Sequence, residues 1–351
     1  MKLGIVGLPQ SGKTTLFNAV SGQQEAVGDY SQAAHRAVIK VPDDRLDNLA
    51  AVIEPKKVTH AEIEFLDAPG FTGKGKKAKS ELEIMHDLRL MEAFVIVVDD
   101  FGPEARAESD FQNIIDEMIL SDLMIIENNI DKLERTLKLT GKQERALELE
   151  ILKRCQDALN GGKLISEIRL TDDEEKAVRG YSFLTLKPHL VAFNISEEKL
   201  KSQKEIYATY EKYRREGIRD ISVICGKIEM EIATLPEADR KDFLKELNIE
   251  RPAMENFIQE SYSLLGLISF FTVGPPECRA WTIKRGLTAP KAAGTVHTDF
   301  EHGFIRAEVA SYEDYVTYKT LPALKAAARL HIEGKDYVVQ DGDVILFRFN
   351  I

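Results

Sequence analysis

The chain has 351 residues, 44% of them hydrophobic and 30% charged, and 58 acidic against 47 basic side chains leave a formal net charge of −11. A chain of this length exceeds what one hydrophobic core usually serves, so we expect more than one domain. The composition excludes an intrinsically disordered protein, and the negative charge excludes a whole-molecule attraction to nucleic acid, so any RNA contact must be local.

The sequence predicts a cytoplasmic protein. The apolar start of the chain is interrupted at Pro9 and Gln10, too early for a signal peptide. There is no apolar run of the roughly 18 residues that a membrane span needs. Cys155, Cys225 and Cys278 have no CxxC spacing, so we expect buried small hydrophobes and neither a disulfide nor a zinc site.

The amino-terminal part alternates short apolar runs with helical patterns, which predicts a parallel sheet flanked by helices. The expected strands are residues 2–6, 63–66, 94–98, 189–193 and 221–224. We assign residues 1–111 and 187–266 to this α/β domain.

Residues 112–186 interrupt the alternation with helix-forming sequence. Apolar residues repeat there at alternating steps of four and three, the seam spacing of a coiled coil. They are Ile119, Leu123, Ile126, Ile130, Leu133 and Leu137, and after a break at Thr140-Gly141 the series continues with Leu149, Leu152, Cys155 and Leu159. We expect an inserted antiparallel helical arm; the alternative is an ordinary helix pair packed on the sheet.

Residues 267–351 have a different sequence pattern, in which aromatic and β-branched runs are separated by Gly and Pro. Asp341-Gly342 is a tight-turn signal before the last run. This part is expected to be a small mixed β domain.

Residues 7–14 read GLPQSGKT and match the P-loop pattern GxxxxGK[ST] between a predicted strand and a predicted helix. Glycines let backbone N–H groups converge on phosphate oxygens at the start of the helix. We expect Lys13 to contact the β and γ phosphates and to act in catalysis. Thr14 and Asp67 are expected to hold Mg²⁺. The predicted phosphate-side contacts are Pro9, Gln10, Ser11, Gly12, Lys13, Thr14 and Thr15.

Asp67-Ala68-Pro69-Gly70 reads as a DxxG element. The N–H of Gly70 is expected to sense the γ phosphate, which makes Gly70 the second catalytic candidate. The Gly- and Lys-rich residues 73–79 that follow are interpreted as a switch that orders on triphosphate binding; a plain solvated loop is the alternative.

Asn194-Ile195-Ser196-Glu197 stands after a predicted strand, where a GTPase would carry NKxD. The longer Glu197 carboxylate suits the guanine edge less well than aspartate does, so adenine is favoured. By itself the segment is also a possible helix N-cap.

These segments together resemble the YchF / Obg-like ATPase family of the translation-factor-related P-loop class, over nearly the whole chain. The matching segments are GLP at 7–9, VPDDRLD at 41–47, NISE at 194–197, RAWTIK at 279–284, AAG at 292–294, HTDFE at 297–301, GFI at 303–305 and GKDYVVQDGD at 334–343.

The resemblance implies a Ras/Obg-like P-loop domain with an inserted coiled-coil hairpin and a carboxy-terminal TGS domain of β-grasp type. It also implies a preference for ATP over GTP, ribosome association, and a role in translation or stress responses. Asn194 and Glu197 correspond to base-reading residues, with Ile195 packing nearby. Gly226 is a further candidate contact of the nucleotide. Ser31 corresponds to the switch I threonine and is a further candidate Mg²⁺ ligand.

The chain also departs from the family pattern. The Gly-rich stretch after the DxxG element is shortened, and Phe71 occupies the place of the water-orienting glutamine of Ras-like proteins. Gln10-Ser11 replaces the usual Asn-Val. These departures leave nucleotide binding intact and make the hydrolysis rate and the activating partner open questions.

The sequence therefore predicts a monomeric, Mg²⁺-dependent ATPase whose helical arm and TGS domain contact a ribosome or RNA. A non-hydrolysing adaptor that uses ATP as a structural ligand is one alternative, and a GTPase of the same class is another. A small-molecule kinase is disfavoured because the sequence shows no acceptor-binding or lid segment.

Overall fold

A computed structural model describes residues 2–22, 35–67, 87–102, 105–140, 144–247 and 249–350. The predictions that concern Ser31, Gly70, Phe71 and residues 73–79 lie outside these ranges. The chain forms two compact units, one of residues 1–37 and 64–264 and the other of residues 38–63 and 265–351. Residues 38–63, which we assigned to the nucleotide-binding domain, thus belong to the carboxy-terminal unit.

The first sheet has the order β2-β4-β1-β5-β6-β7 in the described chain. Its strands are β1 (Lys2–Gly7), β2 (His35–Lys40), β4 (Glu62–Asp67), β5 (Ala93–Asp100), β6 (His189–Ile195) and β7 (Ile218–Ile224). The β4-β1-β5-β6-β7 pairs are all parallel, which confirms the expected α/β architecture. Strand β6 is fully buried and extends through Asn194 and Ile195, two residues beyond its predicted end.

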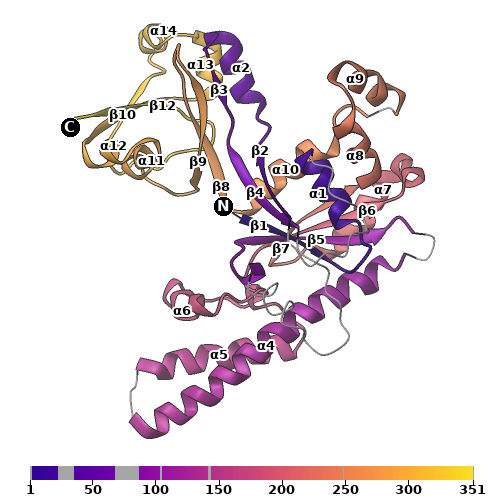
Figure 1. Cartoon of the computed structure of the whole chain (residues 1–351). Helices are drawn as coiled ribbons and strands as arrows, with labels where there is room; N and C mark the ends of the chain where they lie inside the picture. Colours follow the sequence, from indigo (N-terminus) through magenta and orange to yellow (C-terminus); the bar gives the residue numbers. More distant parts are fainter. Residues whose placement is uncertain are drawn as a thin grey trace. The chain divides into compact units, whose positions relative to one another are not determined.

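Helices flank this sheet in the α/β unit (Figure 1). They are α1 (Lys13–Ser21), α7 (Gln203–Tyr210), α8 (Gly226–Thr234), α9 (Glu237–Glu246) and α10 (Ala253–Leu264), while α6 (Asp172–Val178) packs against helix α5 (Glu144–Asn160). Helix α1 packs against α8 and α10, while α7 and α10 both contact the edge strand β7. The contact between α1 and α8 brings the helices that follow β1 and β7 together beside the carboxyl ends of those strands.

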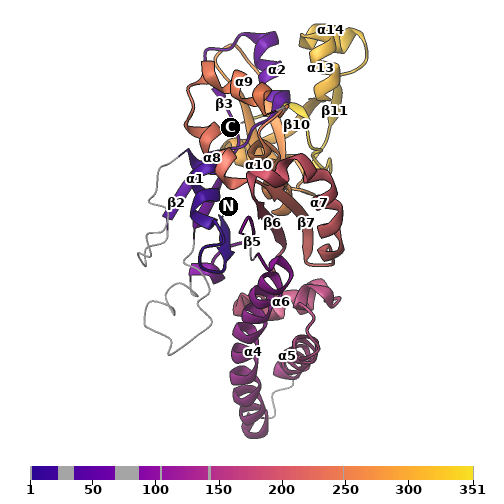
Figure 2. The same cartoon turned by 90° about the vertical axis from the view of Figure 1, so that its right-hand side faces the viewer.

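The inserted arm consists of α4 (Ala107–Thr140) and α5 (Glu144–Asn160), which run side by side in both views (Figure 1, Figure 2). The predicted seam is confirmed except at Leu137, because its other residues all belong to one hydrophobic cluster. Its buried members include Ile126, Ile130, Leu133, Leu152, Cys155 and Leu159. Helix α4 also contacts β5, so the arm and the sheet share one core. All three cysteines are buried and free, as expected.

A buried carboxylate anchors the base of the arm. Asp122 in α4 is fully buried and accepts hydrogen bonds from Arg89 Nη1 at 2.8 Å and from the Leu184 backbone N–H at 3.1 Å. Thr185 donates to it from both its N–H and its hydroxyl, each at 2.8 Å. A buried charge of this kind is stable only when its acceptor positions are filled, so this set of bonds fixes where α4 leaves the sheet.

The second unit is built on a mixed sheet of order β11-β10-β12-β8-β9-β3 in the described residues. Its strands are β3 (Val58–Thr59), β8 (Leu267–Thr272), β9 (Cys278–Lys284), β10 (Phe304–Ala310), β11 (His331–Glu333) and β12 (Val344–Phe349). Its helices are α2 (Asp44–Ile53), α11 (Ala289–Val296), α12 (Thr298–His302), α13 (Tyr312–Tyr318) and α14 (Leu321–Ala326). The expected small mixed β domain is confirmed, with an additional strand, β3, from the amino-terminal half of the chain.

Arg45 explains why residues 38–63 belong to the second unit. Its guanidinium donates to the Asp43 carboxylate at 2.9 Å and to Asp341 Oδ2 at 2.9 Å, and it lies 5.3 Å from the centre of the Phe271 ring. In addition, β3 pairs in parallel with β9. The segment 41–47 is therefore a packing element of the carboxy-terminal unit.

Among the described helices, none combines the length and the apolar content needed to cross a bilayer.

Candidate nucleotide-binding site

The carboxyl ends of four parallel strands form one edge of the first sheet. Strand β1 lies between β4 and β5, so the strand order reverses there and leaves a crevice beyond the strand ends. The register brings the ends together, because Ile5 is opposite Asp67, Gly7 is opposite Val97 and Asp99 is opposite Asn194. Residues that are far apart in the sequence thus meet at this edge.

The loop after β1 has the backbone that the GLPQSGKT segment predicts. Gln10 and Gly12 have positive φ angles of 67° and 90°. A Cβ atom on Gly7 would lie 2.5 Å from the Val97 carbonyl oxygen, so only glycine fits there. Helix α1 begins at Lys13 with no side-chain cap, which leaves its first N–H groups directed toward the loop.

Lys13 lies within this loop. Its side chain is 8% exposed and its Nζ donates to the Leu8 carbonyl oxygen at 2.7 Å. Burial lowers the pKa of Lys13 to about 8, and the negative charge of Asp67 offsets part of that shift. A buried ammonium in this state is stabilised further by an approaching anion, as phosphate binding requires.

The predicted metal-binding pair is brought together by β4 and α1. The Thr14 hydroxyl donates to Asp67 Oδ2 at 2.9 Å, and Asp67 is 5% exposed at the end of β4. A hydroxyl and a carboxylate are hard oxygen donors that fit Mg²⁺, which usually takes one or two protein ligands and fills its other positions with water and phosphate. The described residues contain no group of three or more His, Cys, Asp or Glu side chains that could hold a metal by themselves.

Asn194 ties three loops together. Its Nδ2 donates to the Ser11 carbonyl oxygen at 3.2 Å, and its Oδ1 accepts from the Gly226 N–H at 2.9 Å. A Cβ on Gly12 would lie 2.1 Å from Asn194 Nδ2, and a Cβ on Gly226 would lie 3.1 Å from its Oδ1 and 3.5 Å from Thr15 Cγ2. Gly12 therefore leaves no room for a side chain beside Asn194, and a Cβ on Gly226 would make a tight contact with it. Asn194 sets the distance between the phosphate loop and the loop after β7.

Glu197 follows on a short 3-10 helix, Glu197–Ser202. Its carboxylate is 53% exposed and lies 3.4 Å from Lys227 Nζ, next to Gly226 in α8. An exposed ion pair of this kind contributes little stability, so the carboxylate can exchange partners. Ile195 is 1% exposed and packs with Val223 in a small apolar cluster beneath this loop.

The loop after β5 also borders the site, although the sequence did not predict it. Lys199 Nζ donates to Asp100 Oδ1 at 2.7 Å and to its carbonyl oxygen at 2.8 Å, which ties the Glu197 loop to the end of β5. Phe101 is 43% exposed and lies 3.7 Å from the position of a Cβ on Gly12. Asp99 accepts from the Phe101 N–H at 2.9 Å. The signal was present, since Asp-Asp-Phe-Gly directly follows a predicted buried strand of the parallel sheet.

The fold and this arrangement define a P-loop nucleotide-binding protein of the GTPase-like class. A family model described as "50S ribosome-binding GTPase" matches residues 2–129, and the YchF carboxy-terminal family model, described as a protein of unknown function, matches residues 267–350.

Known proteins resemble the chain over its full length. It is 38% identical to "Ribosome-binding ATPase YchF" of Haemophilus ducreyi, with 100% of this chain and 99% of that protein covered. The protein of the same name from Bacillus subtilis is 37% identical, with 99% of each chain covered. The structure of the Schizosaccharomyces pombe YchF GTPase superposes with a TM-score of 0.83 at 25% identity, covering 99% of this chain and 97% of that one. The chain belongs to the YchF family.

Proposed function

We propose that this protein binds ATP with Mg²⁺ and hydrolyses it slowly to ADP and phosphate, as a nucleotide-dependent switch. The proposal rests on one observation: Lys13, Thr14 and Asp67 converge at the start of α1. The Thr14 hydroxyl oxygen lies 2.9 Å from Asp67 Oδ2. All three groups come from elements whose position the parallel sheet fixes.

On the phosphate side, the residues of the chain would bind and orient a polyphosphate. Lys13 would exchange the Leu8 carbonyl for a phosphate oxygen and neutralise charge that develops there. Thr14 and Asp67 would hold Mg²⁺, which supplies Lewis-acid neutralisation at the phosphates when bound. The N–H groups at the start of α1 add fixed positive dipoles. These groups need no rearrangement at the moment of reaction, and that is how a preorganised site lowers the barrier.

Adenine is the proposed base. The names of the related proteins differ on this point, since two relatives are named ATPases and the S. pombe structure is named a GTPase. Glu197 supports adenine because its longer side chain replaces the aspartate that reads guanine in the NKxD motif. The exposed Phe101 ring beside Gly12 supplies an apolar surface on which a purine can stack.

A ribosome is the proposed partner. The bacterial relatives are named ribosome-binding, and the helical arm and the carboxy-terminal unit are the parts that the nucleotide site does not use. We propose that these parts contact the ribosome or its RNA and that partner binding increases the slow intrinsic hydrolysis. A role in translation or stress regulation rests on the family resemblance.

Phosphate release from Mg-ATP, measured with and without purified ribosomes, tests the proposal. We expect slow release from the protein alone and faster release with ribosomes, and we expect neither with Lys13→Ala. If wild type binds ATP but releases no phosphate in either condition, the protein is an ATP-bound adaptor and the enzymatic proposal fails.

A further inference from the structure

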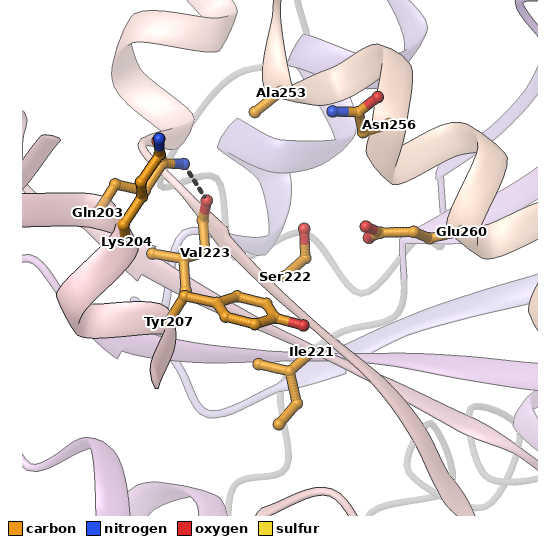
Figure 3. A pocket seen from close by; sticks show the side chains of 9 residues that line it. All are labelled: Gln203, Lys204, Tyr207, Ile221, Ser222, Val223, Ala253, Asn256 and Glu260. Carbon is orange, nitrogen blue, oxygen red and sulfur yellow. Dashed lines mark hydrogen bonds between the residues drawn. The ribbon is translucent and has the colours of Figure 1, made fainter. Parts of the chain in front are cut away.

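A cavity of about 280 Å³ lies in the α/β unit between α7, β7 and α10, at the edge of the sheet (Figure 3). None of the nucleotide-site residues lines it. Its walls come from three separate elements: Gln203, Lys204 and Tyr207 of α7, Ile221, Ser222 and Val223 of β7, and Ala253, Asn256 and Glu260 of α10. The wall combines apolar surface from β7 and the Tyr207 ring with polar groups from α10.

Glu260 is the unusual group in this cavity. Its Oε2 is buried and accepts no hydrogen bond from the described residues. Burial and, to a smaller extent, the nearby negative charge of Asp220 raise the pKa of Glu260 to about 7, against the opposing effects of a hydrogen bond with Ser222 and the positive charge of Arg214. Figure 3 shows the Glu260 carboxylate and the Ser222 hydroxyl on the same side of the cavity. A buried carboxylate oxygen without a donor is costly, so Glu260, which lines the cavity, has one acceptor atom that no group of the described residues satisfies.

The cations near Glu260 do not fill that position. Arg214 Nη2 donates to Asp220 Oδ1 and to the Tyr207 hydroxyl, each at 2.8 Å. Lys204 is an exposed residue of the α7 wall, and Figure 3 shows it across the cavity from Glu260. The charged groups around Glu260 are therefore Asp220 and Arg214 beside β7 and Lys204 on α7.

The outer edge of β7 is already covered by side chains. Gln203 Nε2 donates to the Val223 carbonyl oxygen at 2.7 Å, and the Ile221 N–H donates to Asp220 Oδ1 at 2.9 Å. Backbone N–H and C=O groups of an edge strand that already bond side chains are poor partners for an added strand. This argues against an extended peptide pairing with β7 and in favour of a compact ligand entering the cavity.

We propose that this cavity binds a compact organic cation, an alkyl ammonium or guanidinium group, whose apolar stem packs on Tyr207, Ile221 and Val223 and whose head donates to Glu260. A stem with a charged head matches a wall that is apolar at one end and has an acceptor at the other. A charge-assisted hydrogen bond to a partly buried carboxylate is stronger than a neutral one. Such a group occurs on the lysine or arginine side chain of a basic polypeptide and on a free polyamine.

Isothermal titration of the full-length protein with two probes, 1,5-diaminopentane and Nα-acetyl-arginine amide, tests the proposal and separates the two sources. We expect saturable 1:1 binding of at least one probe at physiological salt. Tighter binding of the arginine amide indicates a polypeptide source, and tighter binding of the diamine indicates a polyamine. In Glu260→Gln, which keeps the shape of the side chain, we expect affinity to fall about tenfold or more.

Glu205→Gln is the matched control, because Glu205 is an exposed carboxylate of α7 that does not line the cavity. It removes the same charge and should leave binding unchanged. A second variant, Asn256→Arg, places a guanidinium in the cavity wall and should abolish binding. Equal weakening by Glu260→Gln and Glu205→Gln would show diffuse attraction to an acidic protein and would overturn the proposal, as would the absence of saturable binding of both probes.

The pH dependence gives an independent readout. A bound cation favours the ionised carboxylate, so binding should be strongest above pH 7 and weaken as the pH falls below it. Glu260→Gln should remove this dependence. Affinity that does not change between pH 8 and pH 6 would contradict the assignment of Glu260 as the acceptor.

Discussion

The phosphate side and the base side of the nucleotide site are built differently. The phosphate side is one contiguous loop whose conformation comes from Gly7, Gln10 and Gly12, with Lys13 at the start of the helix. The base side is assembled from the loops after β5, β6 and β7, and side chains hold them together. Asn194 at the end of β6 bonds the loop after β7 and also the phosphate loop, and the Lys199–Asp100 pair adds the loop after β5.

This difference has a physical consequence. On the phosphate side, backbone groups make the binding surface, so few side chains can be removed with a large effect, and Lys13 is the principal one. On the base side, side chains make both the scaffold and the contact, so substitutions there should affect stability and specificity together. Four predictions test this difference between the phosphate side and the base side, beginning with the variant that should change ATP affinity most.

Lys13→Ala should weaken ATP binding by about 3 kcal/mol, on the order of 100-fold, because the variant loses the buried ammonium that we propose as a donor to phosphate. Its thermal stability should change little, since among the described residues Nζ donates to the Leu8 carbonyl oxygen alone. Equilibrium titration with Mg-ATP measures the affinity. Lys245→Ala, an exposed lysine on α9, is the control and should bind as wild type does. ATP affinity unchanged in Lys13→Ala would refute the phosphate assignment.

Asn194→Ala should lower both stability and affinity, unlike the lysine variant. The substitution leaves the buried Gly226 N–H without its acceptor, which costs about 1 to 3 kcal/mol of folding free energy. Chemical denaturation and ATP titration measure the two effects. Asn128→Ala serves as control, because the exposed Asn128 side chain donates to the Met124 carbonyl oxygen within α4. If Asn194→Ala lost affinity but kept full stability, the asparagine would be a base contact and not a tie between loops.

Raising the pH should weaken ATP binding because the Lys13 ammonium is lost. The pKa of Lys13 in the nucleotide-free protein is about 8, and bound phosphate stabilises the protonated form, so binding takes up a proton above that value. Each pH unit above 8 should then cost at most about tenfold in affinity. Titrations at pH 7 and pH 9 in buffers of different ionisation heat measure both quantities. Lys13→Arg should flatten the profile, since arginine stays protonated. A flat profile in wild type would mean that Lys13 keeps its proton without phosphate.

Glu197→Asp should have the smallest effect. The carboxylate is half exposed and its contact with Lys227 is worth little, so stability should stay within about 0.5 kcal/mol of wild type. The shorter side chain should shift the preference toward GTP by a few-fold. Competition titrations of both nucleotides on the variant measure the shift. A shift toward ATP instead would mean that Glu197 reads the base differently from the aspartate of NKxD.

The contrast also explains what the sequence could predict. The parallel sheet, the helical arm and the Thr14–Asp67 pair follow from local patterns, because period, glycine placement and motif spacing are visible within a few residues. The Lys199–Asp100 tie and the Phe101 surface were missed although Asp-Asp-Phe-Gly follows a predicted strand. Their partners depend on the pairing of β5 with β6 and with β1, and the sequence of this segment alone does not give that pairing. Residues 38–63 were assigned to the nucleotide-binding domain for the same reason. The hydrogen bond from Arg45 to Asp341, which helps to hold them in the carboxy-terminal unit, joins residues 296 positions apart.

We propose that Asn194 and Glu197, beside this phosphate loop, make a site for adenine nucleotides. A competition titration of ATP against GTP on the wild-type protein, with Mg²⁺ at neutral pH, tests it most directly. We predict that ATP displaces bound GTP at concentrations at which GTP does not displace ATP. Equal or tighter binding of GTP would contradict the claim.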